Sequence, residues 1–183
     1  FLGKLRMQHD KATVVAFSFR RMLAGMFSSS FGLENYSEIH GHSLFERSNL
    51  AVQLESIERI CIRESETTMI ARTWDVIILD EIESVLQHFA STTMKGKQSI
   101  IWGLFVEMVK NCKVLIVCDA DIGQRTLNFI GYTRKAENGR VKNLCYHLNR
   151  YVAIETKFFD HASLASWKNT LIRSLVQHEK VFV

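Results

Sequence analysis

The chain has 183 residues, of which 47% are apolar and 23% are charged, and its 23 basic and 19 acidic side chains leave a net charge of +4. This balance is that of a globular protein and excludes a disordered chain, which has too few apolar residues to form a core. No uninterrupted run of 18 apolar residues occurs, which excludes an ordinary transmembrane helix, and we expect no secretory signal peptide. The charge permits contact with nucleic acid without arguing for it.

Four short apolar runs, each ending in small or acidic polar residues, predict a parallel β-sheet. Their apolarity is continuous rather than alternating, which is typical of strands that are covered on both faces. Segments with helical periodicity lie between the runs, so the sequence predicts a doubly wound α/β fold. The runs are 13–17, 50–54, 76–79 and 114–118, and the helical segments are 19–31, 82–90 and 98–111.

The later part of the chain has a different character. Residues 134–150 carry five basic side chains against one acidic side chain and contain Asn-Gly-Arg, which predicts an exposed basic connection or hairpin. An extended stretch over 151–159 and a helix over 163–177 follow. We therefore predict a first domain over 1–149 and the start of a second α/β unit over 150–183.

The cysteines form no C-x-x-C pair, and three of them lie in or beside apolar runs. This pattern favours buried, reduced thiols over a metal site or a disulfide framework. The four residues are Cys61, Cys112, Cys118 and Cys145.

The ends of the predicted strands are where chemistry is expected, because ligands of open parallel sheets bind beyond the carboxyl ends of the strands. Asp80 and Glu81 directly follow the third run. In nucleotide hydrolases with this Walker B arrangement, the first carboxylate holds Mg²⁺ and the second orients and deprotonates the attacking water. The alternative for the pair is a helix N-terminus carrying acidic residues, with no further function.

Four segments in order resemble the motifs of the first motor domain of superfamily 2 helicases, and within them the herpesvirus-type replication origin-binding proteins. Residues 16–24 resemble motif Ia, with Ser-x-Arg after a strand and Arg-x-Leu-Ala in the next helix. Residues 52–60 resemble motif Ib, residues 74–84 resemble motif II with its trailing Glu-Ser, and residues 114–130 resemble the region of motif III. The resemblance covers residues 12–183 and implies a RecA-like, three-layer fold.

The resemblance implies roles for the acidic residues. Asp80 would bind Mg²⁺, and Glu81 would be the catalytic base of ATP hydrolysis. Asp119 and Asp121, which end the fourth run, would couple the nucleotide state to movement on DNA. As plain strand-end caps, these last two residues would need no function.

It also implies a nucleic-acid contact along motifs Ia and Ib, where four residues would hold the backbone of single-stranded DNA. Hydroxyl and guanidinium groups recognise phosphate geometry without reading sequence. The alternatives are a solvated helix start for Arg20 and a surface ion pair of Arg59 with Glu55 or Glu58. The four residues are Ser18, Arg20, Ser56 and Arg59.

The sequence also departs from the family pattern. No G-x-x-x-x-G-K-[ST] phosphate loop occurs, and the fourth run ends in Asp-Ala-Asp where relatives carry Ser-Ala-Thr. In the family, the phosphate loop (Walker A) precedes motif Ia and the arginine finger lies on the second motor domain. We therefore expect an interior part of an ATP-dependent helicase that uses ATP and Mg²⁺ in the complete protein. By itself, this part should not hydrolyse ATP.

The expected partners are DNA, in single-stranded form, and other replication proteins, with no membrane. The expected location is intracellular, in the nucleus, the mitochondrion or a viral replication site. Two other functions stay open from the residues alone. One is a Mg²⁺-dependent phosphatase of the haloacid-dehalogenase type, in which Asp119 is the nucleophile and Asp121 the acid. The other is a non-catalytic DNA-binding module.

Overall fold

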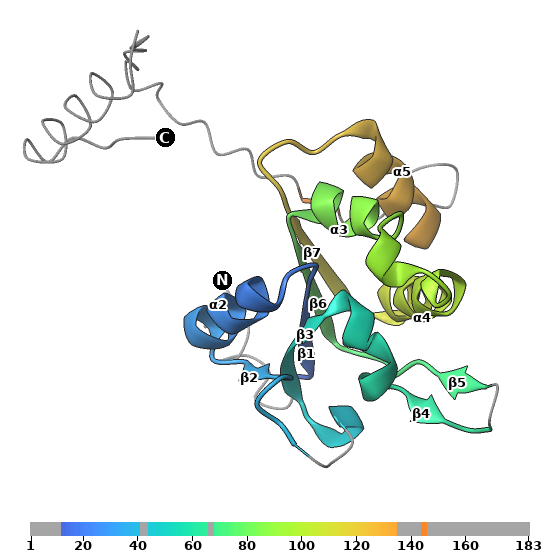
Figure 1. Cartoon of the computed structure of the whole chain (residues 1–183). Coiled ribbons are helices and arrows are strands. Elements are labelled where there is room, and N and C mark those ends of the chain that lie inside the picture. Colours follow the sequence, from blue (N-terminus) through green and yellow to red (C-terminus); the bar gives the residue numbers. More distant parts are fainter. Residues whose placement is uncertain (1–11, 41–43, 66–67, 135–143, 146–183) are drawn as a thin grey trace, which may run out of the picture. The chain divides into compact units, whose positions relative to one another are not determined.

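The computed structural model describes residues 12–40, 44–65, 68–134 and 144–145. The elements between Val14 and Thr133 form an α/β fold. Its strands are β1 (Val14–Ser18), β2 (Glu34–Asn35), β3 (Asn49–Gln53), β4 (Ile62–Arg63), β5 (Met69–Ile70), β6 (Val76–Asp80) and β7 (Val114–Cys118). Five strands form one sheet in the order β2-β3-β1-β6-β7, with every neighbouring pair parallel (Figure 1). β4 and β5 form a separate antiparallel hairpin. The sheet is that of the predicted RecA-like class.

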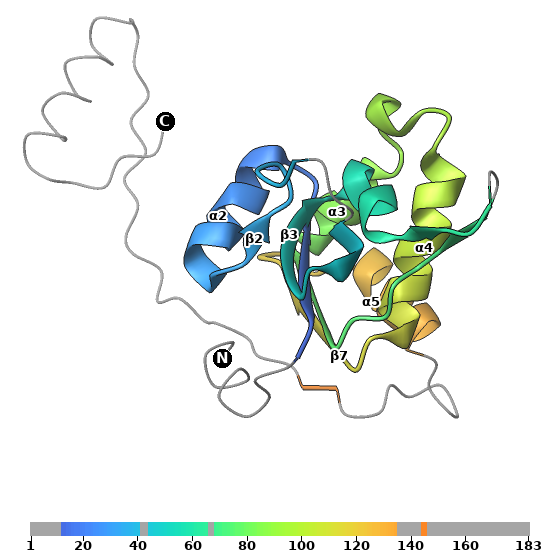
Figure 2. The same ribbon diagram turned by 90° about the horizontal axis from the view of Figure 1, so that it is seen from below.

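Helices lie on both sides of the sheet and complete the three layers. The α-helices are α2 (Arg21–Phe31), α3 (Ile82–His88), α4 (Gln98–Asn111) and α5 (Gln124–Thr133), and the 3₁₀ helices are η1 (Leu44–Glu46), η2 (Leu54–Ile60) and η3 (Thr92–Met94). α2 lies on one side of the sheet, and α3, α4 and α5 lie on the other (Figures 1 and 2). The three helices predicted from periodicity are thereby confirmed.

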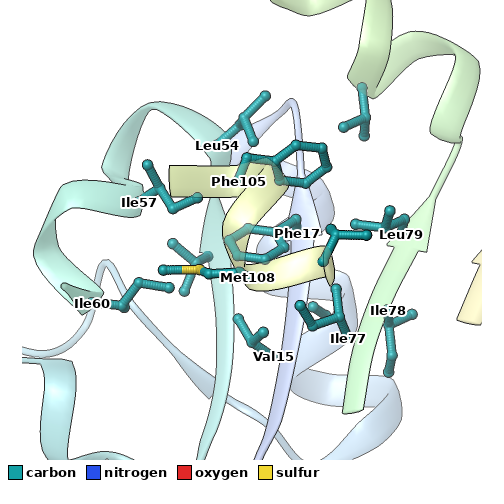
Figure 3. Packing of buried hydrophobic residues seen from close by; sticks show 14 of the residues in the cluster. Val15, Phe17, Leu54, Ile57, Ile60, Ile77, Ile78, Leu79, Phe105 and Met108 are labelled. Carbon is teal, nitrogen blue, oxygen red and sulfur yellow. The ribbon is translucent and has the colours of Figure 1, made fainter. Parts of the chain in front are cut away.

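The core lies between the sheet and α4. Val15 and Phe17 of β1 pair in register with Ile77 and Leu79 of β6, so that all four side chains point to the same face. The Phe105 ring of α4 packs edge-on against the Phe17 ring, with 5.7 Å between the ring centroids (Figure 3). All five side chains are completely buried. Burial of each contributes about 1.5–3 kcal/mol to folding.

Strand β7 differs from the other long strands. β1, β3 and β6 are buried along their middle residues, as predicted for strands covered on both faces. In β7, the two end residues are exposed and the three between them are only half-buried. The reason is its place in the sheet, since β7 is an edge strand of the sheet that the structure describes. Continuous apolarity alone does not distinguish an edge strand from a central one.

Arg134 is not part of an exposed basic connection, contrary to the prediction for this position. Its side chain is half-buried and caps the C-terminus of α4. One guanidinium nitrogen donates to the carbonyl oxygens of Val109 and Cys112 at 3.0 and 2.8 Å, and the other donates to Lys113 at 3.2 Å. Val109 lies in the last turn of α4 and the other two residues lie just beyond it, where carbonyls lack the hydrogen bonds of the helix interior, so the guanidinium supplies donors to them. The rest of the predicted basic connection, apart from the exposed residues 144 and 145, and the predicted second unit lie outside the described residues.

The cysteine prediction is confirmed in part. Cys61 and Cys112 are buried, and burial raises the pKa of the Cys61 thiol to about 12 and also raises that of Cys112. Cys118 and Cys145 are exposed, so the prediction of burial is wrong for them. For Cys118 the cause is its position at the end of the edge strand β7. In the part of the chain that the structure describes, no helix is long and apolar enough to cross a bilayer.

Candidate active site

The four predicted strand ends lie at one edge of the sheet, because β1, β3, β6 and β7 are parallel neighbours. Asp80 is the last residue of β6 and pairs in register with Cys118, the last residue of β7. Glu81 and Asp119 are therefore the first residues beyond two adjacent strands. This shared edge confirms the geometric premise of the sequence analysis. Along this edge, the acidic residues follow β6 and β7, which we call the β6–β7 half. The predicted DNA contacts lie at the ends of β3 and β1 or after them, which we call the β3–β1 half.

Glu81 occupies a strained turn between β6 and α3. Its φ of 49° and ψ of 52° lie in the left-handed region, and no other residue except glycine has a positive φ in the described structure. For an L-residue this conformation costs on the order of 1 kcal/mol. The side chain is exposed and makes no capping hydrogen bond to the helix that follows it. The turn thus holds a free carboxylate out over the edge of the sheet.

Asp80 is half-buried, and its pKa is raised above the ordinary value. Burial is the main cause and the nearby charge of Asp119 adds to it, while the backbone N–H of Glu81 acts in the opposite direction. Among the ion pairs of the described residues, none involves Asp80. A partly desolvated carboxylate beside a second acid is a favourable ligand for a cation.

Glu83 joins α3 to the loop after β7. Its carboxylate accepts hydrogen bonds from the Thr126 hydroxyl at 2.7 Å, the Gly123 amide at 2.9 Å and the Arg125 Nε at 3.0 Å. In return, the Glu83 amide donates to Asp119 Oδ2 at 2.9 Å. The hydrogen bond from the Thr126 hydroxyl is the main reason that the pKa of Glu83 is lowered. These contacts form a two-way clamp between the segments that follow β6 and β7.

The clamp surrounds an open depression of about 430 Å³ whose walls carry four carboxylates and one guanidinium group. No group of three or more His, Cys, Asp or Glu side chains in the described ranges is arranged to hold a metal ion. Magnesium does not need such a group, because it keeps several waters and takes one or two carboxylates together with substrate phosphates. Asp80, half-buried at the adjoining strand end, fits this type of coordination. The charged lining residues are Glu81, Glu83, Asp119, Asp121 and Arg125.

In motif Ia, Ser18 and Arg20 occupy different environments. Ser18 is completely buried, and its hydroxyl donates to the backbone carbonyl of Arg20 at 2.9 Å, which fixes the turn from β1 into α2. Arg20 is exposed at the start of α2, with its guanidinium carbon 5.0 Å from the centre of the Phe19 ring. In motif Ib, Ser56 is half-buried in η2. Contact of these residues with DNA stays a prediction.

Arg59, the fourth predicted DNA contact, is exposed on η2 and holds the segment after β2. Its guanidinium donates to the backbone carbonyls of Tyr36 and Ile39 at 3.4 and 3.1 Å. The alternative ion pair with Glu55 or Glu58 is wrong, because both carboxylates pair with other residues. A backbone-anchored guanidinium is oriented at lower entropic cost than a free one, since its rotamer is already fixed.

Sequence reasoning missed the role of Glu83. The residue was part of the motif II resemblance, but its partners lie 36 to 43 positions further along the chain. A carboxylate two residues after Asp-Glu was the only available signal. That signal does not indicate which backbone amides the fold brings close to the Glu83 carboxylate.

The family model described as "Origin of replication binding protein" matches residues 4–169. The chain belongs to this family. It is 29% identical over 173 residues to an Acanthamoeba polyphaga mimivirus protein named as a replication origin-binding protein, covering 91% of this chain and 21% of that protein. It is 30% identical over 149 residues to an African swine fever virus (strain Badajoz 1971 Vero-adapted) protein named for a helicase/primase complex, covering 81% of this chain and 13% of that protein.

A third relative is the replication origin-binding protein of Psittacid herpesvirus 1, to which the chain is 28% identical over 140 residues. The match covers 72% of this chain and 15% of the herpesvirus protein. The chain thus spans about a fifth or less of the length of these relatives. No solved structure gives a significant match.

Proposed function

We propose that this origin-binding family member forms part of the first motor domain of an ATP-dependent superfamily 2 helicase that acts in DNA replication. The observation that carries the proposal is the shared edge of β6 and β7. It places a partly desolvated Asp80 directly before Glu81, and Glu81 and the Asp119 loop line one open depression. Names of the relatives, which refer to origin binding and to a helicase/primase complex, support the same role.

Each acidic residue has a distinct task in this proposal. Asp80 holds the Mg²⁺ of Mg²⁺–ATP, an ion that supplies charge neutralisation for the phosphates. Glu81 orients the attacking water and accepts its proton, for which an exposed carboxylate over the depression is suitably placed. Asp119 and Asp121 shape the loop after β7, where the Asp121 amide donates to Asp119 Oδ1 at 2.9 Å, and so link nucleotide state to movement.

The β3–β1 half of the edge is the proposed contact for single-stranded DNA. Arg20 and Arg59 are exposed there and supply guanidinium groups to phosphate oxygens. Ser56, three residues before Arg59, is half-buried. Such contacts position a strand without reading its bases. Replication proteins are the proposed partners, and the proposed location is intracellular, at the site of replication.

The environment of Asp119 favours the helicase proposal over a haloacid-dehalogenase-type phosphatase, in which Asp119 would be the nucleophile. Both of its carboxylate oxygens accept backbone hydrogen bonds, one from Glu83 and one from Asp121. These hydrogen bonds engage both oxygens in holding the loop after β7, which is a structural role. The helicase assignment needs only that Asp119 hold its loop.

Exchange of Glu81 for glutamine tests the proposal in the full-length protein that contains this chain. Glu81→Gln should lower DNA-stimulated ATP turnover about 10²-fold, because a general base is lost, and leave nucleotide affinity within twofold. Glu107→Gln, on the exposed side of α4, is the matched control and should keep full turnover. Undiminished turnover in Glu81→Gln would refute the assignment of the base. Absence of ATP turnover in the unaltered protein would refute the proposed function itself.

A further inference from the structure

His88 and Glu55 connect two parts of the edge that the sequence keeps far apart. His88 is the last residue of α3, and Glu55 lies in η2 directly after β3. The His88 Nε2 and Glu55 Oε1 atoms are 2.5 Å apart, and only 15% and 24% of the two side chains are exposed. The second oxygen, Oε2 of Glu55, is buried and has no hydrogen-bond partner in the described structure. The imidazole therefore compensates a largely desolvated carboxylate.

The same imidazole also contacts the turn that follows β1. The centroids of the Phe19 and His88 rings are 6.1 Å apart. The Arg20 guanidinium lies over the Phe19 ring, 5.0 Å from its centroid. A chain of packed groups thus leads from Arg20 through Phe19 to His88 and on to Glu55. Arg20 belongs to the proposed DNA contact, and Glu55 directly precedes Ser56 of the same contact.

The opposite end of α3 belongs to the acidic site. The helix begins immediately after Glu81, and Glu83 in its first turn carries the clamp to the β7–α5 loop. Its seven residues span two turns, about 10 Å, which is short enough to move as a rigid unit. A shift at either end of α3 is transmitted to the other.

We propose that α3, held at its C-terminus by the His88–Glu55 hydrogen bond, is the element through which the nucleotide site and the DNA contact influence each other. The inference rests on the proposed function and adds two positioning residues to it. Neither residue is among the proposed contacts to nucleotide or DNA. Coupling between two sites requires an element whose position both ligands bias, and α3 contacts the regions of both sites, through Glu83 at one end and His88 at the other.

The test measures DNA stimulation of ATP turnover, together with basal turnover, in the full-length protein. His88→Leu and Glu55→Met each remove the hydrogen bond while keeping bulk, and each should lower the stimulation ratio about fivefold or more. Basal turnover and the affinity for single-stranded DNA should stay within twofold. The double variant should be no worse than either single variant, because both remove the same link. His88→Gln retains a donor and should restore at least half of the stimulation.

Lys97→Gln is the matched control, since it breaks another pair of η2, the one between Lys97 Nζ and Glu58 Oε2 at 2.9 Å, without touching α3. It should leave the stimulation ratio unchanged. An unchanged ratio in His88→Leu and Glu55→Met would overturn the inference, as would an equal loss in Lys97→Gln or a loss matched by basal turnover. If the unaltered protein shows no ATP turnover, the proposed function fails and the inference fails with it.

Discussion

The two ends of the sheet use acidic residues in opposite ways. At the amino end, Asp75 precedes β6 and accepts hydrogen bonds from the Thr13 amide at 2.7 Å and the Thr13 hydroxyl at 3.0 Å. Lys113 completes the network, with its Nζ 2.6 Å from Asp75 Oδ1. Lys113 is the main cause that lowers the pKa of Asp75 to about 2. This carboxylate ties together the starts of β1, β6 and β7.

At the carboxyl end, Asp80 belongs to the same strand but has the reverse environment. Its pKa is raised by burial and by Asp119, and the ion pairs among the described residues leave it out. Glu81 next to it carries backbone strain. Charged groups with a structural role have partners within the protein, whereas charged groups that bind a ligand often lack such partners. The contrast supports the carboxyl end of the sheet as the proposed functional end, independently of any relative.

Replacement of Asp75 should cause the largest change in stability. Asp75→Ala removes the acceptor of three hydrogen bonds and should lower the free energy of unfolding by about 2–3 kcal/mol, measured by urea denaturation of the 183-residue chain. Asp121→Ala, an exposed acid at the other end, is the control and should change it by less than about 0.5 kcal/mol. Equal losses of unfolding free energy in the two variants would show that acidic residues at the two ends of the sheet do not differ in their structural role.

The Asp75 contribution also has a defined pH dependence. Its pKa is about 2 in the folded chain against an ordinary value of 3.8, so the unfolded chain binds the proton more readily. The stabilisation is therefore complete above pH 3.8 and is lost as the pH falls through about 2. Asp75→Ala should show a shallower loss of stability across this range.

The sequence predicts those features that depend on local patterns and misses those that depend on contacts between distant segments. Asp80 and Glu81 were recognisable because an apolar run followed by Asp-Glu is a local pattern, and parallel strands bring such tips to one edge. The burial of Ser18 is not predictable from its own residue type, since it follows from the central position of β1 in the sheet, where the carbonyl of Arg20 satisfies its hydroxyl. The edge position of β7 was hidden too, because strand order does not follow chain order. The basic composition of its neighbours predicts an exposed Arg134, and the sequence does not show its carbonyl partners, which lie 21 or more positions earlier.

A smaller effect is expected at the clamp. Glu83→Gln keeps the shape of the side chain but removes its charge, which weakens the hydrogen bonds from the Gly123 and Thr126 groups and from Arg125. The amides of Gly123 and Thr126 both donate to Glu83 Oε1, at 2.9 and 3.3 Å. Their protons should exchange with solvent about tenfold faster in the variant, as followed by hydrogen exchange. Glu107→Gln is the control at a distance from the clamp. Unchanged protection in Glu83→Gln would mean that the loop after β7 is held by other contacts.

The smallest effect should have the opposite sign. Because the folded chain raises the pKa of Asp80, its charged form is disfavoured by folding, and this penalty is present at pH values above the folded pKa. Asp80→Asn should therefore increase the free energy of unfolding at pH 7, by about 0.5 kcal/mol, since water screens a half-exposed carboxylate. The gain should vanish at pH 3, where Asp80 is protonated. Asp121→Asn serves as the control, and a loss of stability in Asp80→Asn at pH 7 would make Asp80 a structural acid like Asp75.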